Sequence, residues 1–344
     1  MIASPTIFDR SLRRRRLDRA AASHARAGFL HQRAARDLAE RLAMLSRTFP
    51  VGVELGARQG GLARALGEAA PGKVGLLIET GLSARMLGSG PRVLLVADEE
   101  RLPLAAASVD LVISALALHW TNDLVGALIQ ARQALKEGGL FLGALLGGAT
   151  LTELRQVLLE AEIEILGGAG PRVSPFADAA DAAGLLSRAG LVEPVVDVDR
   201  VSVRYDHPLR LLADLRAMGE TSVLAQRPGP LRRAVVARAS EIYLQRFSGA
   251  DGRISASFEI LTLTGWAPGP TPSSGGRRDR GADVVEHRIG ALGEEIDRGH
   301  DRQEDHGDDQ AVLHRRRPAA AGNEPLQSQS RSHAASGASA GGIG

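Results

Sequence analysis

The fold is decided by the stretch Val51-Gly-Val-Glu-Leu-Gly-Ala-Arg-Gln-Gly-Gly61, which runs directly into Leu62-Ala-Arg-Ala-Leu66. An apolar strand ends at an acidic residue, a glycine-bearing turn comes next, and a helix begins. In an open α/β sheet this unit brings backbone N–H groups and a helix N-terminus close to a nucleotide-like ligand. Gly56 and Gly60 remove side chains where such a ligand approaches the main chain. Many α/β proteins use the same unit only for packing, so its meaning depends on the strands and acids elsewhere in the chain.

Further apolar runs predict a sheet around this first strand. Strands are predicted at Val51–Leu55, Val74–Ile78, Val93–Val96, Val109–Ser114, Leu140–Leu146, Val195–Tyr205 and Ser255–Leu263. Helices are predicted at Gly60–Leu66, Asp123–Leu135, Thr150–Leu166 and Asp178–Ala189. Residues 206–254 have helical periodicity and are predicted as an inserted helical cap between the last two strands. We therefore predict a doubly wound, mostly parallel seven-stranded α/β sheet.

Composition excludes several classes of protein. The 344 residues are 44% hydrophobic, which supports a substantial core. The apolar runs are too short and too often interrupted by charge to span a membrane. The chain has no cysteine, which excludes disulfides, thiolate zinc sites and a cysteine nucleophile. A formal net charge of only +2 gives no general field that favours nucleic acid.

The N-terminal segment, residues 1–46, is predicted to be a basic helical arm. Its arginines share the first twenty positions: Arg10, Arg13, Arg14, Arg15, Arg16 and Arg19. Arginine-rich starts also occur in organelle transit peptides. However, Asp9 and Asp18 interrupt the run, and it continues into a single helix predicted near Leu17–Leu45. We favour an arm that belongs to the fold, in a cytoplasmic protein of a bacterium or in the mitochondrial matrix of a eukaryote.

The composition changes after Pro268. Residues 269–344 contain no aromatic residue and are rich in Gly, Arg, Asp, His, Ala and Ser. Such a segment buries too little apolar surface to offset its chain entropy, so we predict disorder, and we hypothesise that it is read out of frame. Asp297-Arg-Gly-His300-Asp301 has metal-binding residue types, but a solvated charged tail explains it better. Residues 47–268 are then one domain that includes the cap, and no metal site is predicted.

Two acids end neighbouring predicted strands. Glu79 comes after the second strand, where a carboxylate can accept hydrogen bonds from both ribose hydroxyls of a nucleoside. Asp98 comes after the third strand and can accept a hydrogen bond from an exocyclic amine of adenine. Helix capping is the better explanation for either acid alone, but two acids at successive strand ends after a glycine turn favour a bound nucleoside. Arg58 occupies the middle glycine position of a dinucleotide motif, and no P-loop lysine is present, so a nucleoside without phosphate fits better.

Ordered motifs resemble those of class I S-adenosylmethionine-dependent methyltransferases. They are Glu54-Leu-Gly-Ala-Arg-Gln-Gly60, Ala97-Asp-Glu-Glu-Arg-Leu-Pro103, Val109-Asp-Leu-Val-Ile-Ser114 and Lys136-Glu-Gly-Gly139. Others are similar to a bacterial branch related to the mitochondrial complex I assembly factor 5, with biotin-pathway malonyl-carrier-protein methyltransferases as more distant relatives. These are Phe8-Asp-Arg10, Leu118-His-Trp-Thr-Asn-Asp-Leu124, Pro171-Arg-Val-Ser-Pro-Phe176, Asp214-Leu-Arg-Ala-Met-Gly-Glu220 and Leu263-Thr-Gly-Trp-Ala-Pro268. The resemblance covers residues 8–268 and implies a Rossmann-like fold.

The resemblance implies S-adenosyl-L-methionine as cofactor and assigns its binding positions. Those positions are Glu54, Gly56, Ala57, Gly60, Glu79, Asp98, Glu99 and Ser114. Gly56 and Gly60 would lie beside the amino-acid part, with Glu54 supporting their turn. Glu79 would hold the ribose, Asp98 the adenine amine, and Ser114 would edge the pocket.

Candidates for the chemistry are fewer. His119, after the fourth strand, is a candidate general base if the acceptor is a hydroxyl or amine, whereas a carboxylate acceptor needs no base. A loop histidine packed against Trp120 explains His119 equally well. Trp120 covers the substrate or closes the core. Arg155 and Arg172 are candidates for binding an anionic substrate, although surface ion pairs are the ordinary explanation for such arginines.

Three functions remain open from the sequence. The first is methyl transfer to a small molecule or a carrier protein. The second is modification of a protein such as a respiratory complex I subunit, where the resemblance points to arginine hydroxylation. The spacing of His24, His31, His119 and His207 predicts no two-histidine, one-carboxylate iron site to support such oxygen chemistry. The third is a cofactor-binding assembly chaperone without turnover.

Overall fold

A seven-stranded sheet forms the centre of the protein. The computed structural model describes residues 6–269. The strand order is β3-β2-β1-β4-β5-β7-β6. The bounds are β1 Phe49–Leu55, β2 Val74–Gly81, β3 Val93–Val96, β4 Val109–Ala115, β5 Leu135–Leu146, β6 Val192–Tyr205 and β7 Ile254–Trp266. Neighbours from β3 to β5 are parallel, whereas β7 runs antiparallel to both β5 and β6. The predicted doubly wound, mostly parallel sheet is confirmed.

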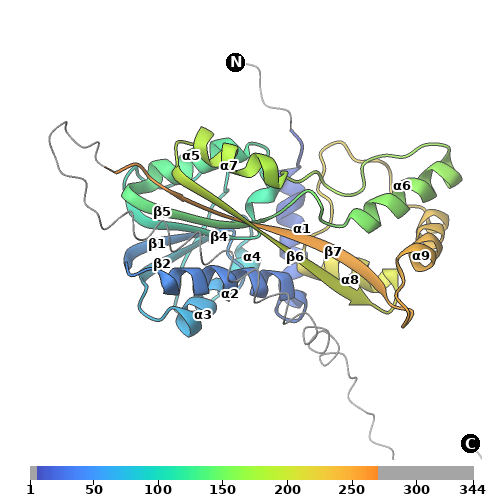
Figure 1. The fold of residues 1–344 in the computed structure, drawn as a ribbon, viewed down its shortest axis with the longest axis horizontal. Coiled ribbons are helices and arrows are strands. Elements are labelled where there is room, and N and C mark those ends of the chain that lie inside the picture. Colours follow the sequence, from blue (N-terminus) through green and yellow to red (C-terminus); the bar gives the residue numbers. More distant parts are fainter. Residues whose placement is uncertain (1–5, 270–344) are drawn as a thin grey trace, which may run out of the picture. The chain divides into compact units, whose positions relative to one another are not determined.

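Helices cover both faces of this sheet (Figure 1). On one face lie α2 (Phe29–Met44) and α3 (Gly61–Ala69), and on the other lie α5 (Leu124–Ala134) and α7 (Ala179–Arg188). The central strand β4, Val-Asp-Leu-Val-Ile-Ser-Ala, is buried at every position, as expected for a parallel strand covered on both faces. Because β1, β2, β3 and β4 are parallel, the segments that come after them meet at one edge of the sheet.

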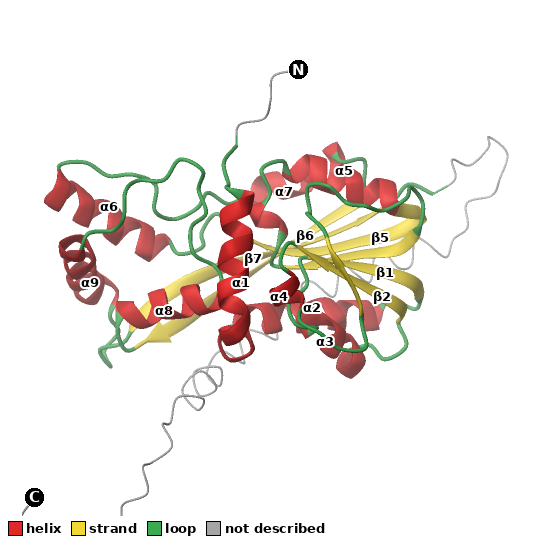
Figure 2. Ribbon diagram, turned by 180° about the vertical axis from the view of Figure 1, so that it is seen from behind, coloured by secondary structure: helices red, strands yellow, loops and turns green. Residues whose placement is uncertain are grey.

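The N-terminal helix is broken where the sequence predicted one continuous helix over Leu17–Leu45. Instead, α1 spans Arg10–Ala27 and α2 begins at Phe29. Gly28 separates them, and a Cβ atom there would lie 2.8 Å from the His24 ring and from the His24 carbonyl oxygen. The break turns α1 away from α2, so that α1 packs against α8 and α4 (Ala84–Leu87) (Figure 2). The buried ring of His24 therefore makes glycine necessary at this corner.

The predicted cap between the last two strands is helical. It contains α8 (Pro208–Met218) and α9 (Arg233–Phe247), and α9 packs against α6 (Thr152–Leu166). The cap is tied to the sheet by Tyr243, whose hydroxyl donates to the Ser255 carbonyl oxygen at 2.9 Å. The inserted helical cap that the sequence predicted is confirmed.

Within residues 6–269 no helix is both long and apolar enough to cross a bilayer. The expectations for residues 270–344, including disorder, the Asp297–Asp301 motif and the reading frame, lie outside the described residues.

Candidate functional site

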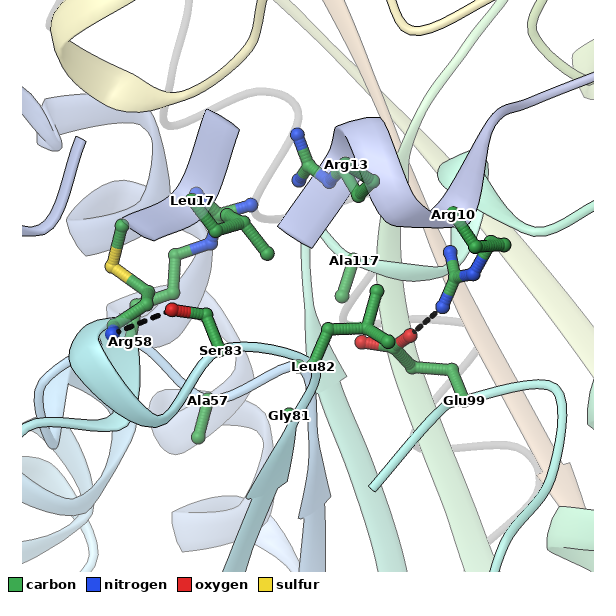
Figure 3. Close-up of a pocket in the computed structure, with 12 residues that line it drawn as sticks. Arg10, Arg13, Leu17, Ala57, Arg58, Gly81, Leu82, Ser83, Glu99 and Ala117 are labelled. Carbon is green, nitrogen blue, oxygen red and sulfur yellow. Dashed lines mark hydrogen bonds and ion pairs between the residues drawn. The ribbon is translucent and has the colours of Figure 1, made fainter. Parts of the chain in front are cut away.

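A pocket lies where the carboxyl ends of the parallel strands meet (Figure 3). Its volume is about 310 Å³, including space open to solvent. The segments after β1, β2, β3 and β4 all contribute, and α1 closes one side. The lining residues are Arg10, Arg13, Leu17, Gly56, Ala57, Arg58, Gly81, Leu82, Ser83, Met86, Glu99 and Ala117. Four strand ends that converge on one hollow form the arrangement that α/β proteins use for ligand binding.

Glycine is required in the turn after β1. Gly56 has φ +75°, and a Cβ atom there would lie 2.1 Å from the Ala117 Cβ. Gly60 has φ +66° and precedes α3, where a Cβ atom would lie 2.6 Å from Nη1 of Arg92. The Ala57 N–H donates to the Thr80 carbonyl oxygen at 2.8 Å and thus ties the turn to β2. At Gly56 the turn therefore presents its main chain to the pocket, beside the side chain of Arg58.

Glu54 lies in β1, two residues before Gly56. Its side chain is 2% exposed, and Oε2 has no hydrogen-bond partner among the described residues. Burial, with a smaller contribution from Glu79, raises the pKa of Glu54 to about 8. Beside it, the hydroxyl of Ser114 donates to the Leu55 carbonyl oxygen at 2.9 Å and joins β4 to β1. Glu54 thus keeps acceptor capacity at the base of the turn, whereas Ser114 is engaged in fixing the strands.

Glu79 lies in β2, two residues before its end at Gly81, and is buried, with 1% of its side chain exposed. Its carboxylate forms an ion pair with Arg92. Burial raises the pKa of Glu79, while Arg92 acts in the opposite direction. The acid is therefore placed at the predicted strand end with a cation already beside it.

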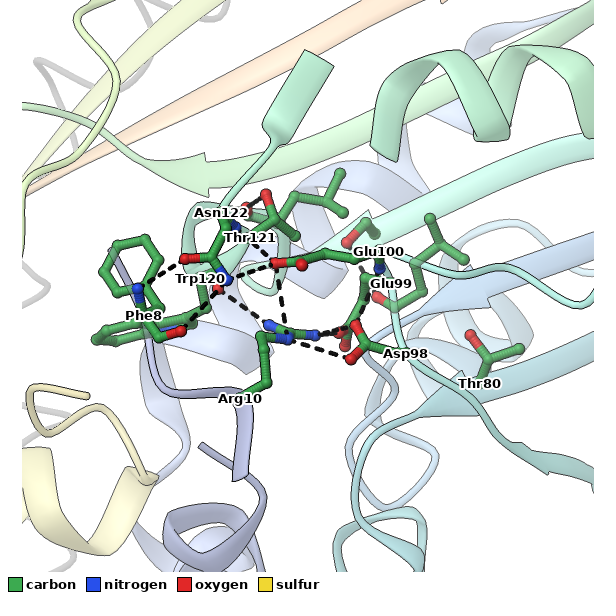
Figure 4. A network of polar contacts seen from close by, with 12 residues as sticks. Phe8, Arg10, Thr80, Asp98, Glu99, Glu100, Trp120, Thr121 and Asn122 are labelled. Carbon is green, nitrogen blue, oxygen red and sulfur yellow. Dashed lines mark hydrogen bonds and ion pairs between the residues drawn. The ribbon is translucent and has the colours of Figure 1, made fainter. Parts of the chain in front are cut away.

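Arg10 of α1 links the acids after β3 to the loop after β4 (Figure 4). Its Nη2 lies 2.5 Å from Oδ1 of Asp98 and also contacts Glu99, and its Nη1 donates to the Trp120 carbonyl oxygen at 2.9 Å. The side chain of Asn122 accepts from the N–H of Phe8 at 2.7 Å and continues this network. Helix α1 is therefore fastened directly over the predicted nucleoside-binding acids.

His119 and Trp120 lie on a short 3-10 turn, η1 (Leu118–Trp120), and both are buried. The rings pack with centroids 5.3 Å apart, and the His119 side chain has no exposed area. The His119 Nε2 lies 3.3 Å from Oε2 of Glu220, and Nδ1 lies 3.4 Å from the Leu146 N–H. Burial lowers the pKa of His119. Its role as a base stays a prediction, and the packed arrangement is what the geometry shows.

The two arginines predicted to bind substrate do not line this pocket. Arg172 forms an ion pair with buried Glu162 and donates to the Gly229 carbonyl oxygen at 2.6 Å. Arg155 lies exposed on α6, with Nη1 3.5 Å from the Gly148 carbonyl oxygen. Local ion pairing therefore explains Arg172, and substrate binding by either residue stays a prediction.

No definite role could be assigned from the sequence to Glu220, a buried acid that contacts two residues of the pocket wall. It comes after α8 and lies between Arg13, Arg58 and His31, all of them buried. Its signal in the sequence was only its place at the end of the Asp214–Glu220 motif. Arg58 stands at a glycine position of the family motif, and its side chain turns inward to this carboxylate.

Three histidines from separate parts of the chain lie close to one another and to Glu220, which their spacing in the sequence does not indicate. The rings of His24 and His31 lie 5.0 Å apart, while His31 and His119 both approach Glu220. The break at Gly28 and the C-terminus of α8 bring them together, neither of which the sequence spacing reveals. In the part of the chain that the structure describes, no group of three acidic or histidine side chains is arranged to hold a metal ion.

Comparison with known proteins agrees with this geometry. The "Methyltransferase domain" family matches residues 53–143. The mitochondrial arginine-hydroxylase NDUFAF5 of Danio rerio is 36% identical over 266 residues, which cover 76% of this chain and 83% of that protein. The malonyl-[acyl-carrier protein] O-methyltransferase of Laribacter hongkongensis is 31% identical over 293 residues, which cover 81% of this chain and 95% of that protein. The chain belongs to the class I S-adenosylmethionine-dependent methyltransferases.

As a class I methyltransferase, the chain is an enzyme of a family that uses S-adenosylmethionine. The family match includes the turn after β1, both strand-end acids Glu79 and Asp98, and Ser114. Among solved structures, the YcgJ protein of Bacillus subtilis aligns with a TM-score of 0.48 at 15% identity, covering 69% of this methyltransferase and 99% of its own chain.

Proposed function

We propose that this methyltransferase binds S-adenosylmethionine in the pocket at the carboxyl ends of β1, β2, β3 and β4 and transfers its methyl group to a carboxylate acceptor. The observation that carries the proposal is the convergence of Gly56, Gly81, Glu99 and Ala117 on one pocket. These residues come from four separate strand ends, and each is small or acidic where a nucleoside-bearing ligand needs space or an acceptor.

Of the predicted cofactor positions, Gly56, Ala57 and Glu99 line this pocket, whereas Glu54, Gly60, Glu79, Asp98 and Ser114 are not among its lining residues. Gly56 keeps the turn free of a Cβ atom, and Ala57 with Gly60 continues the turn on which the amino-acid part would lie. The unpartnered Oε2 of buried Glu54 supplies an acceptor near that part. Glu79 would accept from the ribose hydroxyls, and Asp98 with Glu99 would face the adenine, because carboxylates accept strongly from donors in sheltered sites.

When bound, the cofactor supplies a methyl group whose carbon–sulfur bond breaks as an acceptor oxygen bonds to the carbon, with the electron pair staying on sulfur. The protein's contribution is positioning, which accounts for a large part of catalysis in such transfers. Arg10, Arg13 and Leu17 of α1 line the pocket and would limit the access of water to a bound cofactor. A carboxylate acceptor gives up no proton, which agrees with both ring nitrogens of His119 facing protein groups.

The carboxylate acceptor is supported by the similarity to malonyl-[acyl-carrier protein] O-methyltransferases. A second candidate is hydroxylation of an arginine in a partner protein, including a respiratory complex I subunit. It is supported by the identity of 36% to the mitochondrial arginine-hydroxylases of Danio rerio and Homo sapiens. A cofactor-binding assembly factor without turnover is the third candidate.

One experiment separates these candidates. The protein is incubated with methyl-labelled S-adenosylmethionine and a cell extract, and products are followed by label and by protein mass spectrometry. A labelled ester that mild base releases supports the proposed reaction. A mass gain of one oxygen on an arginine supports the second candidate instead. Binding without either product leaves the assembly role, and absence of cofactor binding in calorimetry overturns the proposal altogether.

A further inference from the structure

Glu220 is a buried carboxylate that joins three elements around the pocket. It accepts hydrogen bonds from Nη2 of Arg13 at 3.0 Å, from Nη2 of Arg58 at 2.7 Å and from Nε1 of Trp120 at 2.7 Å. Only 4% of its side chain is exposed. Burial alone would raise the pKa of Glu220, but Arg13 and Arg58 hold it well below its usual range. The carboxylate is therefore charged at neutral pH.

The two arginines are placed by the same segment and also line the pocket. Nη1 of Arg13 donates to the Gly219 carbonyl oxygen at 2.6 Å, and Nη1 of Arg58 donates to the Met218 carbonyl oxygen at 3.0 Å. Burial lowers the pKa of Arg13 only to about 10, so its charge persists at neutral pH. Both side chains belong to the wall of the pocket, whereas Glu220 lies behind them and does not line it.

The histidines beside Glu220 do not add charge to this group. Burial lowers the pKa of His31 and of His119, so both rings are neutral at physiological pH. At the pocket wall, Arg10 is paired with Glu99. The guanidinium charges of Arg13 and Arg58 are opposed mainly by the carboxylate of Glu220, with a smaller contribution from Glu99 at Arg13. Removal of the Glu220 carboxylate would leave two neighbouring cations largely uncompensated in a region of low dielectric, where charges act over longer distances than in water.

We infer that Glu220 is a positioning residue that also sets the preference of the pocket between the sulfonium cofactor and its thioether product. The inference rests on the proposed function. S-Adenosylmethionine carries a net positive charge through its sulfonium, whereas S-adenosylhomocysteine is neutral overall and has nearly the same shape. By offsetting Arg13 and Arg58, Glu220 allows the positively charged form to enter a pocket lined by arginines.

The test compares the dissociation constants of the two ligands for each variant by calorimetry. In Glu220→Gln we expect the binding of S-adenosylmethionine to weaken by about tenfold more than the binding of S-adenosylhomocysteine. One unit charge in a partly buried site changes a dissociation constant by that order. A purely structural role would weaken both ligands equally. Equal weakening, or no change in either, overturns the inference.

Arg58→Gln provides a second measurement, in which the expected change in relative affinity for the two ligands has the opposite sign. It removes one cation and leaves Glu220 paired with Arg13, so the variant keeps a compensated pair if Glu220→Gln fails to fold. We expect the preference to shift toward S-adenosylmethionine, and an unchanged ratio or a shift toward S-adenosylhomocysteine contradicts the inference.

Glu162→Gln is the matched control, since Glu162 is a buried carboxylate paired with Arg172 on elements that do not line the pocket. In this control the ratio of the two dissociation constants should equal that of the unmodified protein. A shift of the ratio as large as in Glu220→Gln would overturn the inference. Failure of the unmodified protein to bind either ligand refutes the proposed function instead, so the two failures are distinguishable.

Discussion

Nη2 of Arg58 lies 2.7 Å from Oε1 of Glu220, although 162 positions separate the two residues in the chain. Arg58 belongs to the turn after β1, and Glu220 comes after the C-terminal end of α8. Their contact fixes the turn that forms one wall of the pocket to the inserted cap. The conformation of the proposed cofactor-binding turn therefore depends on a segment outside β1, β2, β3 and β4, the strands whose ends form the pocket.

Glu79→Ala should weaken S-adenosylmethionine binding by roughly ten- to a hundredfold, about 1.5–3 kcal/mol, because it removes the sheltered carboxylate that we propose accepts from the ribose. Arg92→Ala is the control, since it removes the ion-pair partner of Glu79 but keeps the acceptor. We expect binding to persist in that variant. Calorimetry that shows unchanged affinity in Glu79→Ala would show that the ribose lies elsewhere.

Gly56→Ala should reduce the free energy of unfolding by about 2–4 kcal/mol, since it combines an unfavourable positive φ with overpacking. The added Cβ would lie 2.1 Å from the Ala117 Cβ. Urea unfolding measures the loss. Gly61→Ala is the matched variant at the start of α3, where a Cβ meets nothing within 4 Å, and its stability should change by less than about 1 kcal/mol. Equal losses in both variants would contradict the steric explanation.

The stability of the protein should fall as pH rises toward 8 because of Glu54. Its pKa is about 8 in the folded protein against an ordinary value of 4.5. Between these values the folded state retains a proton that the unfolded chain has released, so the stabilisation present below 4.5 is lost as pH rises through 8. Glu54→Gln should show a smaller loss of unfolding free energy between about pH 6 and about pH 8.5.

The control for this pH effect is Glu162→Gln, because its ion pair with Arg172 lowers the pKa of Glu162 despite burial. In this variant the unfolding free energy should change with pH as it does in the unmodified protein over the same range. A Glu54→Gln variant with an unaltered slope would assign the pH dependence to other groups.

Trp120→Phe should destabilise the protein by about 1.5–3 kcal/mol, since it removes the indole N–H that donates to charged Glu220 at 2.7 Å in a buried site. Trp266→Phe at the end of β7 is the comparison, because that ring is only half-buried and lies on a different element from Glu220. Chemical denaturation of both variants gives the difference. Similar losses would mean that ring packing, and not the Glu220 contact, accounts for the effect.

The sequence predicted the sheet because its signals are local. Apolar runs of strand length at Val74–Ile78 and Val109–Ser114, separated by helical periodicity, indicate parallel strands without knowledge of their partners. The same locality made the predicted helix over Leu17–Leu45 too long. The helix is interrupted at Gly28, where a Cβ atom would collide with the ring of His24. Such a contact has no signature in the apolar periodicity.

The positions of Gly56 and Asp98 just after strands, and of Glu79 near the end of β2, could be predicted from the sequence alone, since each depends on the strand that it follows or belongs to. The surroundings of those residues could not. Arg10 reaches Asp98 across 88 positions, and Arg58 and His119 meet Glu220 across 162 and 101. Only the tertiary structure decided these pairings, because long-range ion pairs depend on how helices pack on the sheet, whereas the strand–turn–helix unit depends on the backbone preferences of its own residues.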